Sequence, residues 1–257
     1  MTVPSARVSL RDAADQLGVH YQTAYRWVRQ GVLPAVKVGG TYEVTLEAIE
    51  ELRRVRAMPR PPPAQRRVRD WAPFAECLSR SLLVGDEAAI RDELGQLVQG
   101  GVTLVEICDR VMSPALVHLG QAWADGKITV AEEHRASAIC ERVLGRWTPA
   151  PPGRPRGTAV VCSPPSDEHN LPGQMATAVL RENHWRVHHL GTGVPPADIR
   201  SMVAAEGAEL VVISVTWPSA RPEAAGMAAA LRADGCRVLI GRPGLTMADL
   251  IAEVRAG

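Results

Sequence analysis

Two proline clusters constrain the fold of this chain more than any other feature. The first is Met58-Pro59-Arg60-Pro61-Pro62-Pro63, and the second is Pro149-Ala150-Pro151-Pro152-Gly153-Arg154-Pro155. Proline fixes its own φ and has no N–H to donate, so a helix does not continue through either cluster. The clusters therefore predict three folded segments and two stiff linkers, with these bounds: 1–57, 58–70, 71–148, 149–157 and 158–257.

The composition excludes several classes of protein. The chain of 257 residues has no run of about 18 apolar residues, so we expect no membrane-spanning helix. The first 20 residues hold no apolar stretch that would serve as a secretory signal, which favours a cytoplasmic location. The five cysteines are odd in number and lack zinc-site spacing, so neither a disulfide framework nor structural zinc is expected.

The charge is unevenly distributed along the chain. Residues 1–70 contain 12 Lys and Arg against 7 Asp and Glu, whereas residues 71–149 contain 7 against 11 and residues 150–257 contain 10 of each. A basic segment in a chain with a net charge of +1 favours binding of a polyanion by that segment alone. A solvated charged surface would give the same count, so the local pattern has to decide.

The first segment has the pattern of a winged helix-turn-helix. Ser9 is a candidate N-cap for a helix that ends at Gly18. A second helix is predicted from about His20 to Gln30 and ends at Gly31; in a helix-turn-helix this helix enters the major groove of DNA.

A hairpin and a third helix complete this segment. Residues 35–44 alternate around Gly39-Gly40 and predict a hairpin, or wing, and the third helix is predicted over about 46–58. Side chains suited to phosphates and base edges are expected on the second helix and the wing: Tyr21, Gln22, Thr23, Arg26, Arg29 and Lys37. The run from Leu10 to Pro34 resembles the MerR/excisionase-type DNA-binding domain, which implies a double-stranded DNA operator as partner.

The middle segment has the pattern of a helical bundle. Between residues 71 and 147, apolar residues recur at spacings of three, four or seven, which predicts four or five short helices. Thr129 can cap the last helix, with Glu132 completing a capping box. Glu133 and His134 follow and, being adjacent, are expected to point in different directions, while Trp123 ends the preceding helix.

The third segment alternates strands with helices. Strands are predicted over 158–162, 186–190, 210–215 and 237–241, and helices over 174–183, 199–206 and 223–234. This alternation predicts a doubly wound parallel α/β sheet of the Rossmann-like or flavodoxin-like kind. Such sheets bind ligands at the carboxyl ends of their strands, which here means the loops 163–173, 214–218 and 241–246.

The first of these loops carries a histidine two residues after an aspartate. Asp167 can accept one ring N–H of His169, which fixes the tautomer and leaves the other nitrogen free for a metal. A single histidine does not hold a free metal ion, so the pair favours a metal that arrives in its own macrocycle. In isolation, however, an exposed loop histidine without any ligand looks the same. No catalytic constellation is evident, which favours a protein that is not an enzyme.

The bundle, the Asp167-Glu168-His169 motif and the spacing of Trp123 from Glu133-His134 together resemble the cobalamin-binding module of methionine-synthase type. With the MerR-like domain in front, nearly the whole chain resembles the CarH/LitR-type cobalamin-dependent transcriptional regulators, which sense light through adenosylcobalamin. The resemblance implies adenosylcobalamin as cofactor and a homo-oligomer, a dimer or a tetramer.

The resemblance also implies roles for individual residues. His169 would be the lower cobalt ligand and Asp167 its hydrogen-bond partner. Trp123, Glu133 and His134 would cover the upper face, where the adenosyl group lies. Five further positions would line the cobalamin site: Gly173, Ser214, Thr216, Gly241 and Arg242.

Several positions depart from the family pattern. Pro172 replaces the glycine expected three residues after the ligand histidine, and Gly173 comes only afterwards. Thr216 replaces the leucine of a Ser-x-Leu motif, and Arg242 the second glycine of a Gly-Gly pair. Small residues at these positions make room for the nucleotide tail, so Arg242 would close its channel or reach a phosphate.

A further departure concerns light. In the photoreceptors a histidine directly after the tryptophan captures cobalt once the Co–C bond is cleaved, and here that position is Ala124. Alanine cannot ligate a metal. We therefore expect no bis-histidine photoproduct through this position and an altered or absent light response.

The sequence thus predicts a cytoplasmic transcriptional repressor whose affinity for DNA is set by a corrinoid. One alternative is a DNA-binding regulator that has lost cobalamin and senses another ligand or a partner protein, as Pro172, Thr216 and Arg242 would favour. The other is a corrinoid-carrying subunit of a methyltransferase or mutase. The basic recognition helix argues against that second alternative.

Overall fold

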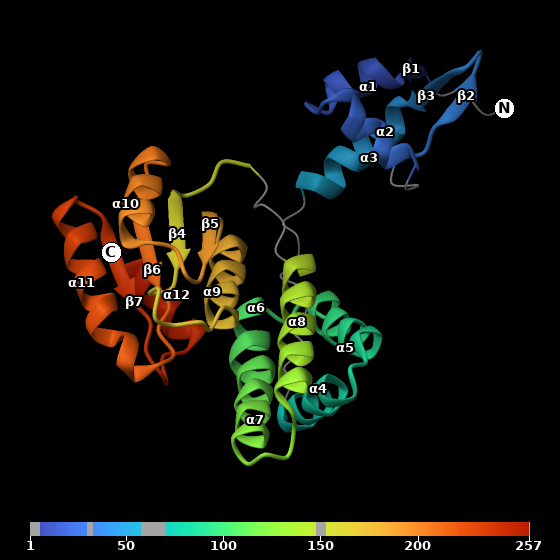
Figure 1. Cartoon of the computed structure of the whole chain (residues 1–257). Coiled ribbons are helices and arrows are strands. Elements are labelled where there is room, and N and C mark those ends of the chain that lie inside the picture. The colour runs from blue at the N-terminus through green and yellow to red at the C-terminus, as the bar shows by residue number, and fades with distance from the viewer. Residues whose placement is uncertain (1–5, 30–32, 58–69, 148–152, 257) are drawn as a thin grey trace. The chain divides into compact units, whose positions relative to one another are not determined.

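The computed structural model describes residues 6–29, 33–57, 70–147 and 153–256, and the chain divides into two compact units, 1–64 and 65–257 (Figure 1). The predicted helix end at Gly31, residues 58–69 of the first proline-rich linker and residues 149–152 of the second lie outside the described residues. Within the described ranges, no helix is both long enough and apolar enough to cross a membrane.

The first unit contains a helix-turn-helix and a small antiparallel sheet. Ser9 caps the first helix by accepting a hydrogen bond from Asp12 N at 3.2 Å, and Gly18, with φ of +64°, turns the chain toward the second helix. The strand order is β1-β3-β2, and the first strand, of three residues, was not predicted. The elements are β1 (Arg7–Ser9), α1 (Leu10–Gln16), α2 (Tyr21–Arg29), β2 (Val36–Val38), β3 (Thr41–Thr45) and α3 (Leu46–Ala57).

A single apolar core holds this unit together. Leu10, Ala24, Leu33, Val44 and Ile49 are almost fully buried in it, and they come from α1, α2, the segment before the wing, β3 and α3. The core therefore fixes the second helix against the wing, and the helix-turn-helix predicted from the sequence is confirmed.

The second unit begins with the predicted helical bundle. Its core is formed by leucine, isoleucine and valine side chains at the predicted helical spacing, Leu78, Ile90 and Leu94 among them. Residues 104–124 form one continuous helical run that contains a π-helical turn. The bundle elements are α4 (Ala72–Val84), α5 (Glu87–Gln99), α6 (Leu104–Ile107), the π-turn η1 (Cys108–Met112), α7 (Ser113–Ala124) and α8 (Val130–Trp147).

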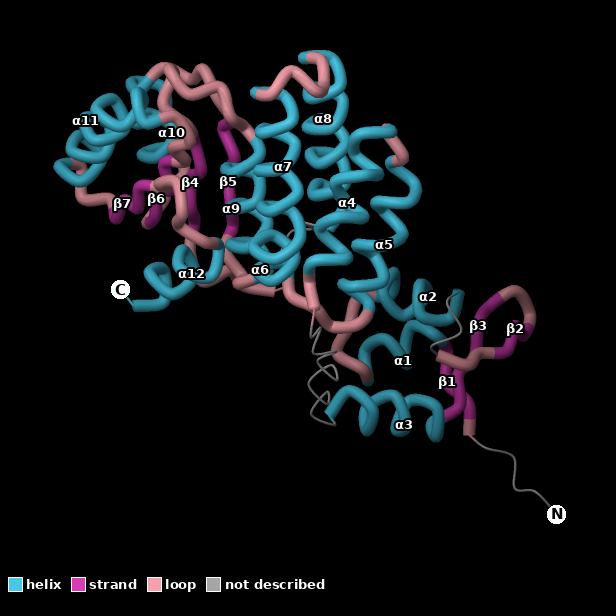
Figure 2. Tube along the Cα trace, turned by 90° about the horizontal axis from the view of Figure 1, so that it is seen from below, coloured by secondary structure: helices cyan, strands magenta, loops and turns pink. Residues whose placement is uncertain are grey.

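The second unit continues with a four-stranded parallel sheet in the order β5-β4-β6-β7 (Figure 2). Helices α9 and α12 share a core with the bundle on one face, and α10 and α11 cover the other face. This confirms the doubly wound fold class. The elements are β4 (Thr158–Cys162), α9 (Leu171–Glu182), β5 (Arg186–Gly191), α10 (Pro196–Ala205), β6 (Leu210–Ile213), the 3-10 turn η2 (Pro218–Ala220), α11 (Arg221–Ala233), β7 (Arg237–Ile240) and α12 (Met247–Ala256).

Several predicted boundaries were wrong by two or three residues, namely the starts of α9, α10 and α11 and the end of β6. Helix α9 begins at Leu171, so Pro172 and Gly173 lie in its first turn and not in the preceding loop, because proline is tolerated where helical N–H groups have no partner. Strand β6 ends at Ile213, so Ser214 and Val215 belong to the loop at the carboxyl edge. The C-terminal helix α12 was not predicted.

Carboxylates join the bundle to the α/β part of this unit. Asp109 in the π-turn accepts hydrogen bonds from Met247 N at 2.7 Å and Ala248 N at 3.0 Å, and so caps α12. In the other direction, Glu182 at the end of α9 accepts from Leu104 N at 2.8 Å at the start of α6. The two parts thus cap each other's helices.

Candidate functional site

The predicted aspartate–histidine pair lies at the carboxyl edge of the sheet, where the strand order reverses between β4 and β6. Asp167 is 1% exposed and accepts two hydrogen bonds from His169, from its backbone N at 3.1 Å and from its ring Nδ1 at 2.8 Å. Its second oxygen accepts from Thr216 N at 2.6 Å and Trp217 N at 3.0 Å. One carboxylate therefore joins the first loop to the second.

The environment of Asp167 determines the state of the imidazole. Burial alone raises the pKa of Asp167, but the backbone N–H groups of Thr216 and Trp217 and the two bonds from His169 outweigh it and lower that pKa below its usual value. An ionised carboxylate can only accept hydrogen bonds, so Nδ1 of His169 carries the proton. In the neutral ring Nε2 then has a free lone pair, on a side chain that is 40% exposed. This is the form of histidine that binds a metal.

Trp217 lies against His169 and was missed by the sequence reasoning. The ring centroids are 5.2 Å apart and the planes meet at 77°, an edge-to-face contact, with Trp217 itself 46% exposed. The imidazole is thus fixed by a carboxylate and by an indole. Because the two residues are 48 positions apart in the sequence, no local pattern links the two rings.

The acid–histidine pair of the bundle lies in the first turns of α8. Thr129 and Glu132 form the predicted capping box, with Glu132 N to Thr129 Oγ1 at 3.2 Å and Thr129 N to Glu132 Oε2 at 2.8 Å. Glu133 and His134 do not point apart as predicted, because Glu133 Oε2 and His134 Nδ1 are 2.9 Å from each other. The neighbouring side chains bend toward one another, and His134 remains 75% exposed.

One face of α8 extends from this pair to the histidine loop. Glu133, Ser137 and Glu141 are four residues apart and therefore lie on one face of the helix. Ser137 Oγ donates to Glu133 at 2.7 Å, and Glu141 accepts from Asn170 Nδ2 at 2.7 Å, directly after His169. Since a helix rises 1.5 Å per residue, roughly 12 Å separates the acid–histidine pair from this contact along α8.

The predicted upper-face residues are not in contact with the aspartate–histidine pair. Trp123 ends α7 and is 51% exposed. Among the described residues, no hydrogen bond or ring contact joins Trp123, Glu133 or His134 to His169. The structure brings Asp167, His169 and Thr216 together and leaves the three bundle residues apart from them.

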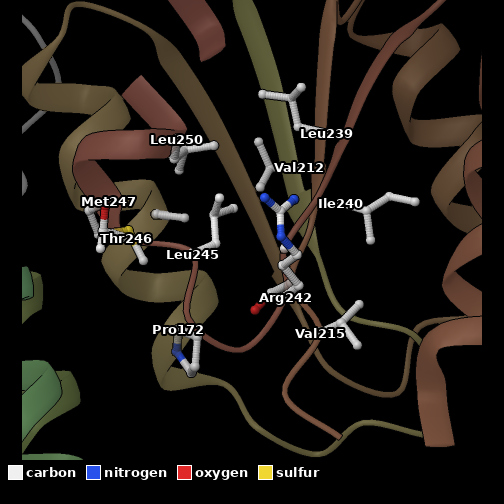
Figure 3. Close-up of a pocket in the computed structure, with 13 residues that line it drawn as sticks. Pro172, Val212, Val215, Leu239, Ile240, Arg242, Leu245, Thr246, Met247 and Leu250 are labelled. Atoms are coloured by element: carbon white, nitrogen blue, oxygen red, sulfur yellow. The ribbon is translucent and has the colours of Figure 1, made fainter. Parts of the chain in front are cut away.

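The third loop borders a small pocket at the same edge of the sheet (Figure 3). Its volume is about 70 Å³, and its walls are mostly apolar. Gly241 is packed closely, because a Cβ there would lie 3.4 Å from Ile213 O and 3.4 Å from Val215 N. The pocket is lined by three predicted cobalamin-binding residues, Ser214, Gly241 and Arg242, together with Pro172, which departs from the family pattern.

The structure shows the surroundings of two further predicted cobalamin-binding positions. A Cβ at Gly173 would lie 3.0 Å from His189 Nε2, so a larger residue there would require the imidazole of His189 to shift. Thr216 acts through its backbone N–H, which any residue except proline would provide. The replacement of leucine by Thr216 therefore leaves the bond to Asp167 intact.

The predicted DNA-binding residues lie on the surface of the first unit. Tyr21, Gln22, Arg26 and Arg29 of α2 are exposed, as is Lys37 on β2, and Thr23 is half-buried. An aromatic row that was not predicted runs beside them: Tyr21 stacks on Tyr25 at 6.3 Å, and Tyr25 meets the edge of Tyr42 at 5.9 Å.

Comparisons with known proteins define the class. Residues 8–54 match the family model of a helix-turn-helix domain, and residues 75–147 match that of a B12 binding domain. Both matches lie in one chain, and the B12 binding match covers the helical bundle of the predicted cobalamin-binding module.

Individual relatives point to a particular kind of regulator. The chain is 31% identical over 150 residues to the HTH-type transcriptional repressor CarH of Myxococcus xanthus, covering 56% of this chain and 50% of that one. It is 25% identical over 241 residues to the repressor CarA of the same organism, covering 85% and 80%. The chain therefore spans about half the length of CarH and four fifths of CarA, and the predicted resemblance to CarH-type regulators is confirmed.

Solved structures of corrinoid proteins are similar at low identity. The monomethylamine corrinoid protein of Methanosarcina barkeri has a TM-score of 0.48 at 16% identity, covering 65% of this chain and 81% of that one. A cobalamin-binding protein of Desulfitobacterium hafniense has a TM-score of 0.37 at 18% identity, covering 70% and 96%.

Proposed function

We propose that this protein is a transcriptional repressor that binds an operator through α2 and the wing and whose affinity for DNA is set by a corrinoid. One observation carries the proposal. The chain that bears an exposed, basic recognition helix also bears an imidazole held by a buried carboxylate at the ligand-binding edge of an α/β sheet. A protein with this combination acts by binding, which is why we propose no catalytic residue.

The residues around His169 fit the cobalt of a corrinoid. His169 offers a single nitrogen with a free lone pair on a partly exposed ring, which suits a metal whose other positions in the plane are filled by its macrocycle. When bound, the corrinoid would supply a cobalt ion that accepts a nitrogen ligand from the protein. In this proposal His169 is the lower ligand, and Asp167 and Trp217 hold its ring.

The bundle supplies the other side of the site in this proposal. Trp123, Glu133 and His134 would cover the upper face of the corrinoid, and the Glu141–Asn170 bond would hold α8 against the histidine loop. Ala124, next to Trp123, offers no second imidazole. We therefore expect light to produce no bis-histidine form through that position.

Linkage would couple the corrinoid to DNA. A corrinoid that binds between the bundle and the sheet favours the assembly of subunits to which it binds most tightly. Coupling of this kind typically changes the affinity for a second ligand, here DNA, about 5- to 150-fold. We propose a homo-oligomer, a dimer or a tetramer, in which several helix-turn-helix domains engage repeated half-sites at a high effective concentration.

Operator binding tests the proposal directly. The full chain loaded with adenosylcobalamin would select a duplex from a random-sequence library, and that duplex would then be titrated with loaded and unloaded protein. The double variant Arg26→Ala, Arg29→Ala should bind at least about tenfold more weakly and with a shallower salt dependence. The control is Arg186→Ala in the second unit, which should bind as the wild type does. Equal affinity of the double variant, or equal affinity of loaded and unloaded protein, would contradict the proposal.

A further inference from the structure

A small pocket at the third loop lies at the same edge of the sheet as the histidine loop. It opens at the carboxyl ends of β6 and β7, and Pro172, three residues after His169, forms part of its wall. Apolar side chains from β6, β7, α9 and α12 make up most of the lining, as Figure 3 shows. A side arm of a macrocycle held at His169 would enter here.

The pocket is too small for an aromatic base. Its volume is about 70 Å³, whereas an apolar cavity of about 150 Å³ is what a six-carbon ring such as benzene occupies in a protein interior. Dimethylbenzimidazole, the base that ends the nucleotide tail of cobalamin, has two fused rings and two methyl groups. Forcing extra atoms into packed apolar surroundings costs typically about 1–3 kcal/mol, which corresponds to about 5- to 150-fold in affinity.

Arg242 borders the pocket and provides its cationic group. The residue is exposed, and its guanidinium extends across the pocket in the view of Figure 3. The turn from Arg242 to Leu245, closed by Leu245 N to Arg242 O at 3.0 Å, holds it at this edge. Among the described residues, it makes no side-chain hydrogen bond or ion pair within bonding distance.

The backbone N–H groups that follow are already used. Met247 N and Ala248 N donate to Asp109, and Thr246 N donates to Asp249 at 3.0 Å. The start of α12 is therefore capped and does not attract an anion by itself. The guanidinium of Arg242, which also interacts electrostatically with Asp249, can bind a phosphate or an alcohol oxygen.

We propose that this chain selects corrinoids whose side arm ends before the aromatic base, at an alcohol or a phosphate held by Arg242. The inference rests on the proposed function and names the ligand class within it. The small apolar pocket rejects the base, and Arg242 favours the truncated end. The chain would thus prefer a cobinamide-type corrinoid to complete cobalamin.

Titration with two corrinoids tests the inference. The full apo chain would be titrated with diaquacobinamide and with hydroxocobalamin, and binding would be followed by the shift of the visible spectrum and by calorimetry. We expect the wild type to bind cobinamide at least about fivefold more tightly than cobalamin. Arg242→Ala should reduce that preference at least about fivefold, because it widens the pocket and removes the cation, whereas Arg186→Ala at the opposite end of the sheet should retain it.

The outcomes separate the inference from the proposed function. Cobalamin binding as tight as cobinamide binding, or an unchanged preference in Arg242→Ala, would overturn the inference and leave the proposed function standing. If neither corrinoid bound to protein with the wild-type circular dichroism spectrum, both would be overturned.

Discussion

Replacing Asp167 by asparagine perturbs the site with the smallest change in shape. The carboxylate is buried and accepts four hydrogen bonds, two from His169 and one each from Thr216 N and Trp217 N. Asparagine keeps one oxygen and replaces the other with an NH2 group, so two of these donors face another donor. Each buried donor without an acceptor costs about 1–3 kcal/mol, so we expect the free energy of unfolding to fall by about 2–6 kcal/mol if both donors stay unpaired, and by about 1–3 kcal/mol if the His169 ring changes its tautomer.

The same substitution changes the tautomer of His169. If the amide oxygen keeps the two backbone N–H groups of the second loop, the NH2 group faces the ring, and Nδ1 has to accept a hydrogen bond. The ring proton then moves to Nε2, which loses its free lone pair. Loss of such a partner typically lowers metal affinity about 10- to 100-fold, and we expect that loss for the corrinoid.

Both effects can be measured on the same purified proteins. Urea unfolding followed by circular dichroism gives the free energy of unfolding, and titration with diaquacobinamide followed in the visible spectrum gives the affinity. The control is Asp198→Asn, an exposed aspartate in the first turn of α10. An Asp167→Asn protein that unfolds and binds corrinoid as the wild type does would refute the reasoning.

Three further predictions follow from the same site. Because the native pKa of Asp167 lies below its ordinary 3.8, its ionised form contributes stability that is complete well above pH 3.8 and is lost as the pH falls through the lower native pKa. Acid unfolding followed by circular dichroism should show this pH-dependent loss of stability in the wild type and not in Asp167→Asn. An equal loss in Asp167→Asn would contradict the prediction. Gly173→Ala places a Cβ 3.0 Å from His189 Nε2 and should cost about 1–3 kcal/mol of stability, but less in a His189→Ala background; equal costs in both would exclude the contact as the cause. Trp217→Ala should weaken corrinoid binding by about 0.5–1.5 kcal/mol while Trp217→Phe retains most of it, and calorimetry showing no loss in the alanine variant would exclude a positioning role.

Local sequence relations could be predicted, and relations across the chain could not. Asp167 and His169 are two residues apart, so their hydrogen bond follows from spacing, as does the capping box of Thr129 and Glu132. Trp217 reaches His169 from another loop, and only the folded sheet brings them together. The Glu141–Asn170 bond is also set by packing of the bundle on α9 and has no local signature.

Three features of the structure could not be predicted because the sequence carries too little local information about them. Strand β1 has three residues, too few for an alternating pattern, and it forms because β3 offers a partner. The closeness of Gly173 to an imidazole from the neighbouring strand would have required the parallel register of β4 and β5. Thr216 contributes a backbone N–H, so its side chain gave no information about its role.

The central claim is that the imidazole of His169 binds corrinoid cobalt through Nε2, and electron paramagnetic resonance of the reduced cobalt(II) form tests it most directly. Cobinamide should be used because it brings no base of its own. In the account given above, the unlabelled protein shows the superhyperfine triplet of one nitrogen, protein labelled with nitrogen-15 histidine shows a doublet, and His169→Ala shows neither. A triplet that persists in His169→Ala, or that does not respond to the histidine label, would contradict the claim.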